Sequence, residues 1–336
     1  EAAARGMRPT LAGRDANKLR PLADELQLPL QAFALDDAAG VAAKLEGCAL
    51  ALNCAGPFSQ TAGPMIEACL MSRTHYLDIT GEIDVIEGAA AQNEAAAAAG
   101  VVLLPAVGFD VAPTDCLAAL LAAKAPSATH LELAFNTPLE TSPGTTKSIV
   151  ETIPRGGRVR RGGKLVRVPH AWRAKEIPFA DATRWAATVP WGDVASAYYS
   201  TGIGDIEVYL GIPKKQIASL RWLRWIAPLV GVGFLQRLWK NHITRTVRGP
   251  SAAQRRKTKA QLWGRVTDGS NTLAEATIET PNAYTLTVQA AVAAVERVLA
   301  TPPAAGFQTP SRAFGADFVL QFPDVTLHWR HGEANC

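Results

Sequence analysis

The chain has 336 residues, of which 48% are hydrophobic and 19% charged, and its mean hydropathy is +0.05. This is enough apolar material for two folded domains, and it excludes an intrinsically disordered protein. The five cysteines form no CxxC pair. That spacing argues against a disulfide scaffold or a zinc ribbon, and it predicts a reducing compartment, the cytoplasm.

The net charge of +4 is unevenly distributed along the chain. Residues 1–150 carry 17 acidic and 9 basic side chains, a net charge of −8, whereas residues 151–336 carry 13 acidic and 25 basic ones, a net charge of +12. The segment 208–267 holds thirteen Lys and Arg residues and no Asp or Glu. This asymmetry predicts that the second half faces an anionic partner.

The first 130 residues alternate short apolar strands with Ala-rich helices. Strands are predicted at 8–13, 30–35, 48–54, 75–79 and 101–105, and helices at 16–26, 38–45, 63–71, 83–99 and 114–123. This alternation is typical of a parallel sheet with helices on both faces. We therefore predict an α/β fold with a Rossmann-like domain over residues 1–130.

Residues 131–336 have a different pattern, in which strand-like segments are separated by turns rich in Gly, Pro and Thr. Two hairpins are predicted, with turns at Gly162-Gly163 and Asp268-Gly269, and a helix at 283–299. We predict a second, α+β domain built on a mostly antiparallel sheet. It would bind the substrate and form the contact of a homodimer, and it includes the basic, aromatic-rich segment 208–267.

The order of elements begins at what would be the second strand of a dinucleotide-binding fold. Such a fold opens with a strand, a glycine-rich turn and a helix whose N-terminus binds the pyrophosphate. Glu1–Arg5 is typical of the last turn of a helix, and no GxGxxG motif occurs in the chain. We expect the first strand and the phosphate loop to be missing by N-terminal truncation; the alternative is a sheet that never had this strand.

Five segments carry motifs: LAGRDANKL (11–19), LNCAGPFSQTAGPMIEAC (52–69), THYLDITGE (74–82), LLPAVGFDVAPTDCLA (103–118) and GFQTPSRAFGADFVL (306–320). Together they resemble the saccharopine dehydrogenase-like NAD(P)-binding family, in particular its bacterial branch of trans-acting enoyl reductases of lipid synthesis. The resemblance implies an NAD(P)-dependent oxidoreductase that reduces an acyl, enoyl or carbonyl group of a lipid-like substrate.

Two residues after the first two strands are candidates for binding the adenosine half of the cofactor. Arg14 is suited to the 2′-phosphate of NADP, while the adjacent Asp15 would bind the 2′-hydroxyl of NAD. NADP is the preferred prediction, and a plain surface arginine is the alternative. Asp36 would contact the adenine amino group, or would cap the following helix.

The buried strand that ends at Asn53 leads into the turn Cys54-Ala55-Gly56-Pro57-Phe58. Its small residues allow the main chain to approach a ligand at the carboxyl ends of the strands. We expect this turn to flank the pyrophosphate and the nicotinamide ribose; an ordinary strand-to-helix turn is the alternative. Cys54 is expected to pack rather than react. The resemblance adds Gly108, Phe109 and Asp110 to the cofactor site.

Tyr76 and Asp78 lie two residues apart on one strand and therefore point to the same face. Tyr76 could donate a proton to a carbonyl or an enolate while Asp78 orients it. A hydrogen-bond network that braces the sheet is the alternative. For Asp115, capping of its own helix is the preferred interpretation. No set of His and Cys residues supports a metal site.

The segment 222–239 has Trp at both ends, basic neighbours and a predicted break at Pro228. This composition is typical of an element that lies on a membrane surface, so we expect peripheral contact with anionic lipid; a buried dimer contact is the alternative. The alternative function is therefore a non-catalytic lipid- or membrane-surface protein. Nucleic-acid binding is not expected, because no module for it is recognisable.

Overall fold

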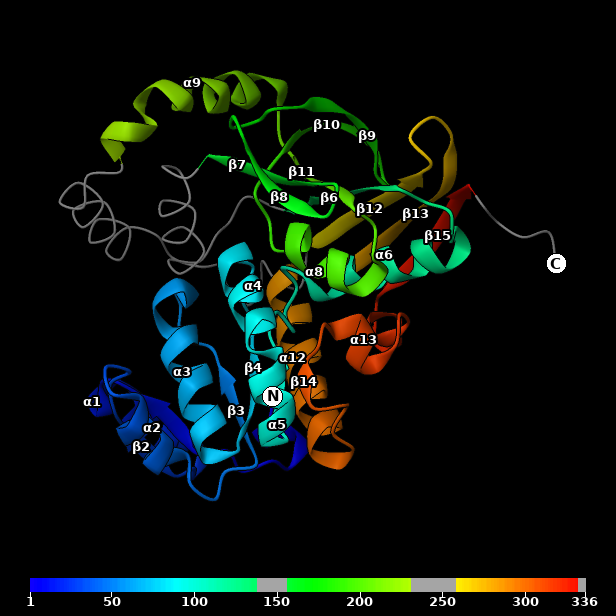
Figure 1. Cartoon of the computed structure of the whole chain (residues 1–336). Coiled ribbons are helices and arrows are strands. Elements are labelled where there is room, and N and C mark those ends of the chain that lie inside the picture. The colour runs from blue at the N-terminus through cyan, green and yellow to red at the C-terminus, as the bar shows by residue number, and fades with distance from the viewer. Residues whose placement is uncertain (138–155, 231–257, 332–336) are drawn as a thin grey trace.

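The computed structural model describes residues 1–137, 156–230 and 258–331, with 223–230 and 331 described through their backbone alone. The parallel sheets and their helices form one half of the molecule and a large mixed sheet forms the other (Figure 1). Helices α6 (Ala112–Lys124) and α8 (Asp193–Thr201) pack between them, since both contact strands of the large sheet and α8 also contacts α4 (Ile83–Ala91).

The first half contains two parallel sheets. One pairs β1 (Leu11–Gly13) with β2 (Leu30–Ala32); the other has the order β14-β5-β4-β3, from β3 (Leu50–Asn53), β4 (His75–Asp78), β5 (Val102–Leu104) and β14 (Gly306–Phe307). The remaining helices here are α1 (Ala16–Leu26), α2 (Ala38–Leu45), α3 (Phe58–Ser72) and α5 (Asn93–Ala99), with a short 3₁₀ turn, η1 (Ala3–Arg5). The predicted α/β fold with a parallel sheet is confirmed.

Two helices differ from their predicted bounds by more than two residues at one end or by an internal break, whereas α6 and α12 differ by one or two residues. The predicted helix 83–99 is broken at Gln92, whose backbone leaves the helical region (φ −92°, ψ 10°). The next residue, Asn93, accepts a hydrogen bond of 2.9 Å from the distant Phe307 N–H. Helix α3 starts at Phe58, five residues before the predicted Gly63, because its first amides are capped by a side chain from another loop, described below.

The second half is a nine-stranded mixed sheet with the order β15-β13-β12-β6-β11-β10-β9 and a hairpin, β7–β8, attached to β11. The strands are β6 (His130–Asn136), β7 (Gly157–Arg161), β8 (Lys164–Val168), β9 (Ala174–Pro178), β10 (Thr183–Thr188), β11 (Asp205–Gly211), β12 (Lys259–Thr267), β13 (Thr272–Pro281) and β15 (Thr326–His331). Only the β6–β11 pair among these described strands is parallel. Both predicted hairpins are confirmed, with turns at Gly162-Gly163 and Asp268-Gly269.

The C-terminal part of the chain returns to the first half. Helix α12 (Ala283–Ala300) is followed by β14, which pairs with β5, and by α13 (Pro310–Phe314) and the 3₁₀ turn η3 (Phe318–Gln321). Leu77 and Leu104 of the parallel sheet pack with Ala290 and Phe318 in one buried cluster. The division of the chain at residue 130 stays a prediction, to which the structure adds this returning segment.

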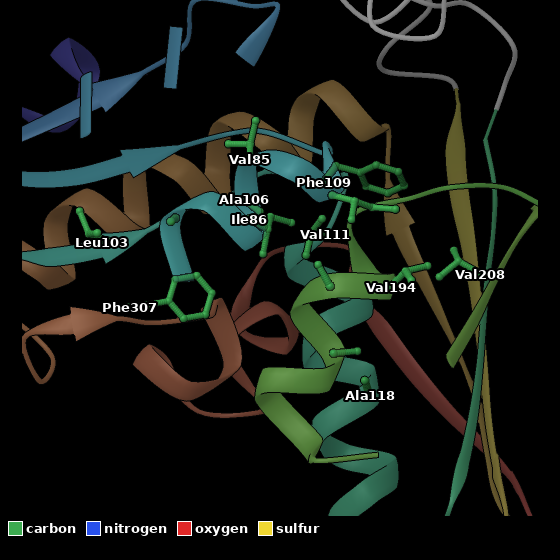
Figure 2. Packing of buried hydrophobic residues seen from close by; sticks show 14 of the residues in the cluster. Val85, Ile86, Leu103, Ala106, Phe109, Val111, Ala118, Val194, Val208 and Phe307 are labelled. Carbon is green, nitrogen blue, oxygen red and sulfur yellow. The ribbon is translucent and has the colours of Figure 1, made fainter. Parts of the chain in front are cut away.

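One apolar cluster joins the two halves (Figure 2). It contains Ile86 and Val111 from the parallel half, Val194 from α8 and Val208 from the large sheet, and all four side chains are at most 1% exposed. Burial of apolar surface at about 25 cal/mol per Å² makes such a contact strongly favourable. The two halves therefore have a fixed relative position, which matters because residues of both reach the site described next.

Helix α9 (Lys214–Val230) covers one end of the large sheet next to β10. Its backbone continues through Pro228, so the predicted break there is wrong: a proline removes one main-chain hydrogen bond without ending this helix. The rest of the predicted aromatic segment, 231–239, lies outside the described residues. None of the described helices is long and apolar enough to cross a bilayer.

Candidate active site

Three loops leave the same edge of the parallel sheet. Asn53 at the end of β3 is the register partner of Asp78 at the end of β4, and Leu77 pairs with Leu104 of β5. The loop after β5 is tied to β4 by a hydrogen bond of 2.8 Å from Val107 N–H to the Asp78 carbonyl. The segments 53–58, 78–82 and 106–110 are therefore neighbours, at the position where parallel sheets bind ligands.

The Asp78 carboxylate accepts hydrogen bonds from β4 and from the loops that follow β4 and β5. Its Oδ2 accepts a hydrogen bond of 2.7 Å from the Tyr76 hydroxyl, and its Oδ1 accepts from the amides of Thr80 (3.0 Å) and Ala106 (2.7 Å). Burial raises the pKa of Asp78 to about 6, against these hydrogen bonds, which favour the ionised form. Asn53 Nδ2 also donates to the Tyr76 hydroxyl, at 3.3 Å.

The predicted convergence of Tyr76 and Asp78 is thus confirmed, but both side chains are 0% exposed. A group that exchanges a proton with a substrate must come within hydrogen-bond distance of it. Asp78 instead binds Tyr76 of its own strand through Oδ2 and joins the ends of β4 and β5 through Oδ1. The arrangement favours the bracing network over catalysis, and a catalytic role of these two residues stays a prediction.

The Asn53 side chain shapes the turn that follows β3. Its Oδ1 accepts from the Ala55 amide (3.0 Å), and its Nδ2 donates to the Thr61 hydroxyl (3.3 Å), which in turn donates to the Ala55 carbonyl (2.6 Å). Cys54, Ala55 and Gly56 are left exposed at the edge. Although Cys54 is exposed as a residue, loss of solvent around its sulfur, and less so the charge of Asp78, raise the thiol pKa to about 11.

Glu82 caps helix α3 from a neighbouring loop. Its two carboxylate oxygens accept hydrogen bonds of 3.0 Å each from the amides of Phe58 and Ser59, the first residues of the helix. The Glu82 amide donates to the Thr80 hydroxyl at 3.0 Å, which fixes the loop. A carboxylate at a helix N-terminus is stabilised by the helix dipole. The sequence groups Glu82 with Tyr76 and Asp78 after one strand, but it does not predict this cap, since nothing in the local pattern links Glu82 to a helix 24 residues earlier.

Asp110 is a second partly buried carboxylate at this edge, beside Glu82. It is only partly buried, and its carboxyl oxygens form no hydrogen bond within the described part of the chain. Burial raises its pKa to about 6. It lies against Gly81, where an added Cβ would be 3.0 Å from the Asp110 Cβ. From the second half, Trp191 Nε1 donates to the Asp110 carbonyl at 2.6 Å.

Gly108 and Phe109 do not reach the exposed turn. An added Cβ at Gly108 would lie 3.1 Å from the Thr287 methyl, and the Phe109 amide donates to the Thr287 hydroxyl at 3.0 Å. They anchor the loop to α12, and Phe109 is only 4% exposed. These contacts with α12 fix the main chain directly before Asp110. Direct contact of Gly108 or Phe109 with a cofactor stays a prediction.

Asp115 does not cap its own helix, so that interpretation is wrong. Helix α6 begins without a side-chain cap at Val111. The Asp115 carboxylate instead accepts from the Ser200 hydroxyl (2.5 Å) and the Ser311 amide (2.9 Å). It therefore joins α8 to the start of α13, both of which are distant in the sequence.

Arg14 and Asp36 lie at the carboxyl ends of β1 and β2, and both are exposed. Arg14 forms no hydrogen bond or ion pair with the described residues, whereas Asp15 caps α1 by accepting from the Asn17 amide at 3.1 Å. Helix α2 is capped by Asp37, which accepts from the Ala39 amide at 3.1 Å. The capping alternative for Asp36 is therefore wrong.

The edge fits one half of a dinucleotide better than the other. The exposed main chain of 54–56 and the partly exposed Asp110 suit a nicotinamide ribose and its reacting ring. The amides at the start of α3, which could bind a phosphate, are already bound by Glu82. No glycine-rich phosphate turn lies among the described residues, and no GxGxxG motif occurs in the sequence. Among the described residues, these three loops therefore offer no free amides that would bind the pyrophosphate of a dinucleotide.

The Rossmann-like half and the mixed second sheet define a dehydrogenase-type fold. The structure is similar to that of apo saccharopine dehydrogenase (L-Glu forming) from Saccharomyces cerevisiae, with a TM-score of 0.65, 98% of this chain and 95% of that chain covered, and 10% identity. At this identity the likeness establishes the fold.

Sequence similarity points to the same proteins. A mouse saccharopine dehydrogenase-like oxidoreductase is 32% identical over 117 residues, which cover 31% of this chain and 27% of that protein. A probable mitochondrial saccharopine dehydrogenase-like oxidoreductase from Arabidopsis thaliana is 39% identical over 67 residues, 20% of this chain and 15% of that protein. The matches thus span about a quarter or less of each relative's length. No protein-family model matches the chain. Sequence and fold together support the saccharopine dehydrogenase-like oxidoreductases as relatives of this chain.

Proposed function

We propose that this chain is an NAD(P)-dependent oxidoreductase whose cofactor and substrate meet at the carboxyl ends of β3, β4 and β5. The observation that carries the proposal is the Asp110 carboxyl, which is partly open and without a described partner at this edge. A carboxyl with a pKa of about 6 can both give and accept a proton near neutral pH. The similarity to dehydrogenases and oxidoreductases supports the same reaction class.

NADP is the cofactor that we propose, with NAD as the alternative. Arg14 is exposed and unengaged among the described residues after β1, so its guanidinium is available to a 2′-phosphate. Asp15 already uses a carboxylate oxygen to cap α1, which leaves it less available to a ribose hydroxyl. The exposed turn 54–56 would hold the nicotinamide ribose. When bound, the nicotinamide supplies or accepts the hydride.

The protein's own contribution would be binding, orientation and proton transfer. Asp110 would exchange a proton with the substrate oxygen or carbon, and its side chain packs closely against Gly81, where a larger residue would displace it. The hydrogen bond from Trp191 would hold the Asp110 main chain in place. Tyr76 and Asp78 would keep β4 and β5 at a fixed separation, so that the three loops stay in register.

For the substrate, we propose a lipid-like molecule with an enoyl or carbonyl group. It rests on the resemblance to the enoyl reductase branch and on the start of α9, where Trp222 is 71% exposed and Lys214, Lys215 and Arg221 lie nearby in the sequence. Such a surface would let the enzyme meet its substrate at a membrane. It also favours the second candidate function, a non-catalytic protein of the lipid surface.

Fluorescence titration with NADPH and NADH separates the two candidates. The oxidoreductase proposal expects quenching of intrinsic fluorescence by NADPH, and cofactor oxidation when an enoyl or ketone acyl thioester is added. Asp110→Asn should retain NADPH binding and lose turnover, while Asp317→Asn, on a distant loop, serves as the control. If neither nucleotide binds to the chain, the non-catalytic alternative stands.

A further inference from the structure

A cavity of about 220 Å³ lies on the large mixed sheet, lined by residues of β13, β15 and the turn after β9 rather than by the ends of the parallel strands. Its walls are Ala180 and Asp181 from the β9–β10 turn, Thr277 and Glu279 from β13, and His328 and Arg330 from β15. The two ends of the sheet meet here, because Arg330 Nη2 donates to the Phe179 carbonyl at 3.0 Å. One water occupies about 30 Å³ of liquid, so the cavity has room for a small molecule.

The strand register directs four polar side chains to this side of the sheet. Thr277 is the antiparallel partner of His328. Glu279 lies two residues after Thr277, and Arg330 two residues after His328, so all four share one face. Gln261 of β12, the register partner of Glu279, shares it as well. The cavity therefore combines hydroxyl, carboxylate, imidazole and guanidinium groups.

Two polar atoms beneath the cavity have no partner among the described residues. Thr277 is 1% exposed, and its hydroxyl oxygen makes no hydrogen bond there. Gln261 is 4% exposed; its Nε2 donates to Glu279 at 2.8 Å, but its Oε1 is unpartnered in the same part of the chain. Buried polar atoms almost always bind protein, water or a ligand. These two atoms indicate a bound group at the floor of the cavity.

The charges around the cavity are of both signs. Asp181 is held by Arg184, and Glu279 by Lys259. The pKa of Glu279 is lowered by hydrogen bonds from Lys259 and then from Gln261, while Asp181 opposes this shift. The two carboxylates are therefore close enough to repel each other. Arg330, by contrast, has no carboxylate partner within the described residues.

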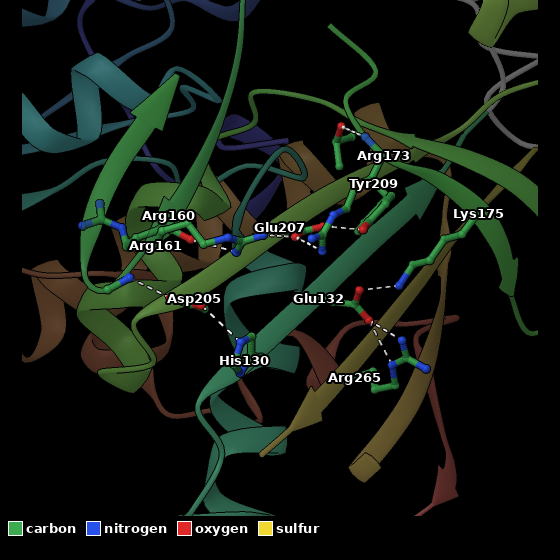
Figure 3. Close-up of polar contacts among 12 residues, drawn as sticks. His130, Glu132, Arg160, Arg161, Arg173, Lys175, Asp205, Glu207, Tyr209 and Arg265 are labelled. Atoms are coloured by element: carbon green, nitrogen blue, oxygen red, sulfur yellow. Dashed lines mark hydrogen bonds and ion pairs between the residues drawn. The ribbon is translucent and has the colours of Figure 1, made fainter. Parts of the chain in front are cut away.

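Neighbouring charges on the same face behave differently (Figure 3). Glu132 accepts from both Lys175 and Arg265, and Glu207 pairs with Arg161 and Arg173. Each of these carboxylates is matched by two cations that satisfy it. At the cavity, Asp181 and Glu279 each have one cationic partner, and Arg330 has no carboxylate partner among the described residues.

We propose that this cavity is a binding site for a small zwitterion, separate from the oxidoreductase site. The ammonium group lies between Asp181 and Glu279, and the anionic group binds Arg330 and His328. The Thr277 hydroxyl contacts the ligand at the cavity floor. A simple anion would meet the two carboxylates and a simple cation would meet the guanidinium, so a molecule with both charges is favoured over either.

The proposal is tested with β-alanine, propionate and ethylamine, because the last two each carry one of the two charged groups of β-alanine on the same two-carbon unit. Calorimetric titration of the full chain needs no nucleotide, so its result is independent of the proposed enzymatic activity. We expect β-alanine to bind at millimolar concentration and each singly charged probe to bind at least about tenfold more weakly. Absence of β-alanine binding, or equal binding of all three probes, overturns the proposal.

Two variants locate the site. Thr277→Val removes an unpartnered hydroxyl at nearly constant shape, so it should fold normally, and Arg330→Gln removes the anion-binding charge. Both should weaken β-alanine binding by about tenfold or more. Thr10→Val makes the same change at an exposed position before β1, in the other half of the molecule, and should have no effect. If Thr277→Val keeps wild-type affinity while the circular dichroism shows a folded protein, the ligand binds elsewhere and the proposal is wrong.

Discussion

The hydroxyl of Tyr76 donates a hydrogen bond of 2.7 Å to the carboxylate of Asp78, and neither side chain reaches solvent. The bond joins two residues of one strand, while the second oxygen of Asp78 binds the amide of Ala106 at the end of the next. A tyrosine and an aspartate in such a fold invite a catalytic interpretation. Their burial favours a role in holding the loops that surround the candidate site, while the catalytic role stays a prediction.

Tyr76→Phe distinguishes these two roles. The substitution leaves one buried oxygen of Asp78 without its hydroxyl donor, which should cost about 1–3 kcal/mol of unfolding free energy. Urea denaturation measures that loss. If the residue only braces the sheet, turnover by the folded variant should change by less than about tenfold. A fall of about 10²–10⁴ with unchanged stability would instead mean that Tyr76 transfers a proton.

Asp110→Asn should have opposite effects on stability and activity. The folded pKa of Asp110 is raised to about 6, so its contribution to stability is present below the unfolded pKa of about 4 and is lost as the pH rises through 6. The neutral variant avoids this loss. We expect it to be more stable than the wild type by about 1–2 kcal/mol at pH 7–8, a value discounted for the partial exposure of the side chain.

Denaturation curves at pH 4 and pH 8 check the stability effect, because the gain should disappear at the lower pH. Turnover should fall by about 10²–10⁴, as expected for loss of a general acid or base. If the variant is neither more stable at pH 8 nor less active, the Asp110 carboxyl is solvated in the folded protein and takes no part in the reaction.

Much of the local structure follows from the sequence. Helices α1 and α2 have their predicted bounds, Ala16–Leu26 and Ala38–Leu45, because each is preceded by an aspartate that caps it. The hairpin turns at Gly162-Gly163 and Asp268-Gly269 follow from glycines with positive φ. In each case the decisive interaction lies within a few residues of the element, where a sequence pattern can reveal it.

The features that sequence reasoning missed depend on distant contacts. The break between α4 and α5 is accompanied by a bond from Asn93 to Phe307, and the early start of α3 by the Glu82 cap. The candidate site shows the same limit. The turn at 53–58 was predictable from its small residues, but the roles of Glu82 and Trp191 arise from loops that meet only in the folded chain.

Glu82→Gln should weaken the start of helix α3. The amide side chain has one acceptor oxygen where the carboxylate has two, so one of the amides of Phe58 and Ser59 loses its partner, and the interaction with the helix dipole is lost. We expect a loss of about 0.5–2 kcal/mol in unfolding free energy. Glu67→Gln, at an exposed position in the middle of α3, is the matched control. Equal stability of the two variants would mean that the cap contributes nothing.

Arg14→Ala tests the choice of cofactor. The guanidinium would bind the 2′-phosphate, which only NADPH carries, so NADPH affinity should fall by about tenfold or more while NADH affinity stays unchanged. Fluorescence titration with both nucleotides gives the comparison, and Arg20→Ala on the exposed side of α1 is the control. A similar loss for both nucleotides would assign Arg14 to the structure of the turn rather than to phosphate recognition.

Trp222 of helix α9 leads to a prediction about membranes. Its side chain is 71% exposed, and Lys214, Lys215 and Arg221 precede it on the same helix. A large apolar side chain next to cations is typical of an element that lies on anionic lipid, where each basic residue adds about 1 kcal/mol. The protein should therefore co-sediment with vesicles that contain phosphatidylserine at low salt, and less so at high salt, because screening weakens the attraction.

Trp222→Ser should reduce the bound fraction, whereas Met71→Ser, which alters an exposed apolar residue on α3, should not. If the wild type does not sediment with these vesicles at low salt, the exposed tryptophan is better explained by a contact between two copies of the chain, which a concentration-dependent sedimentation coefficient would reveal.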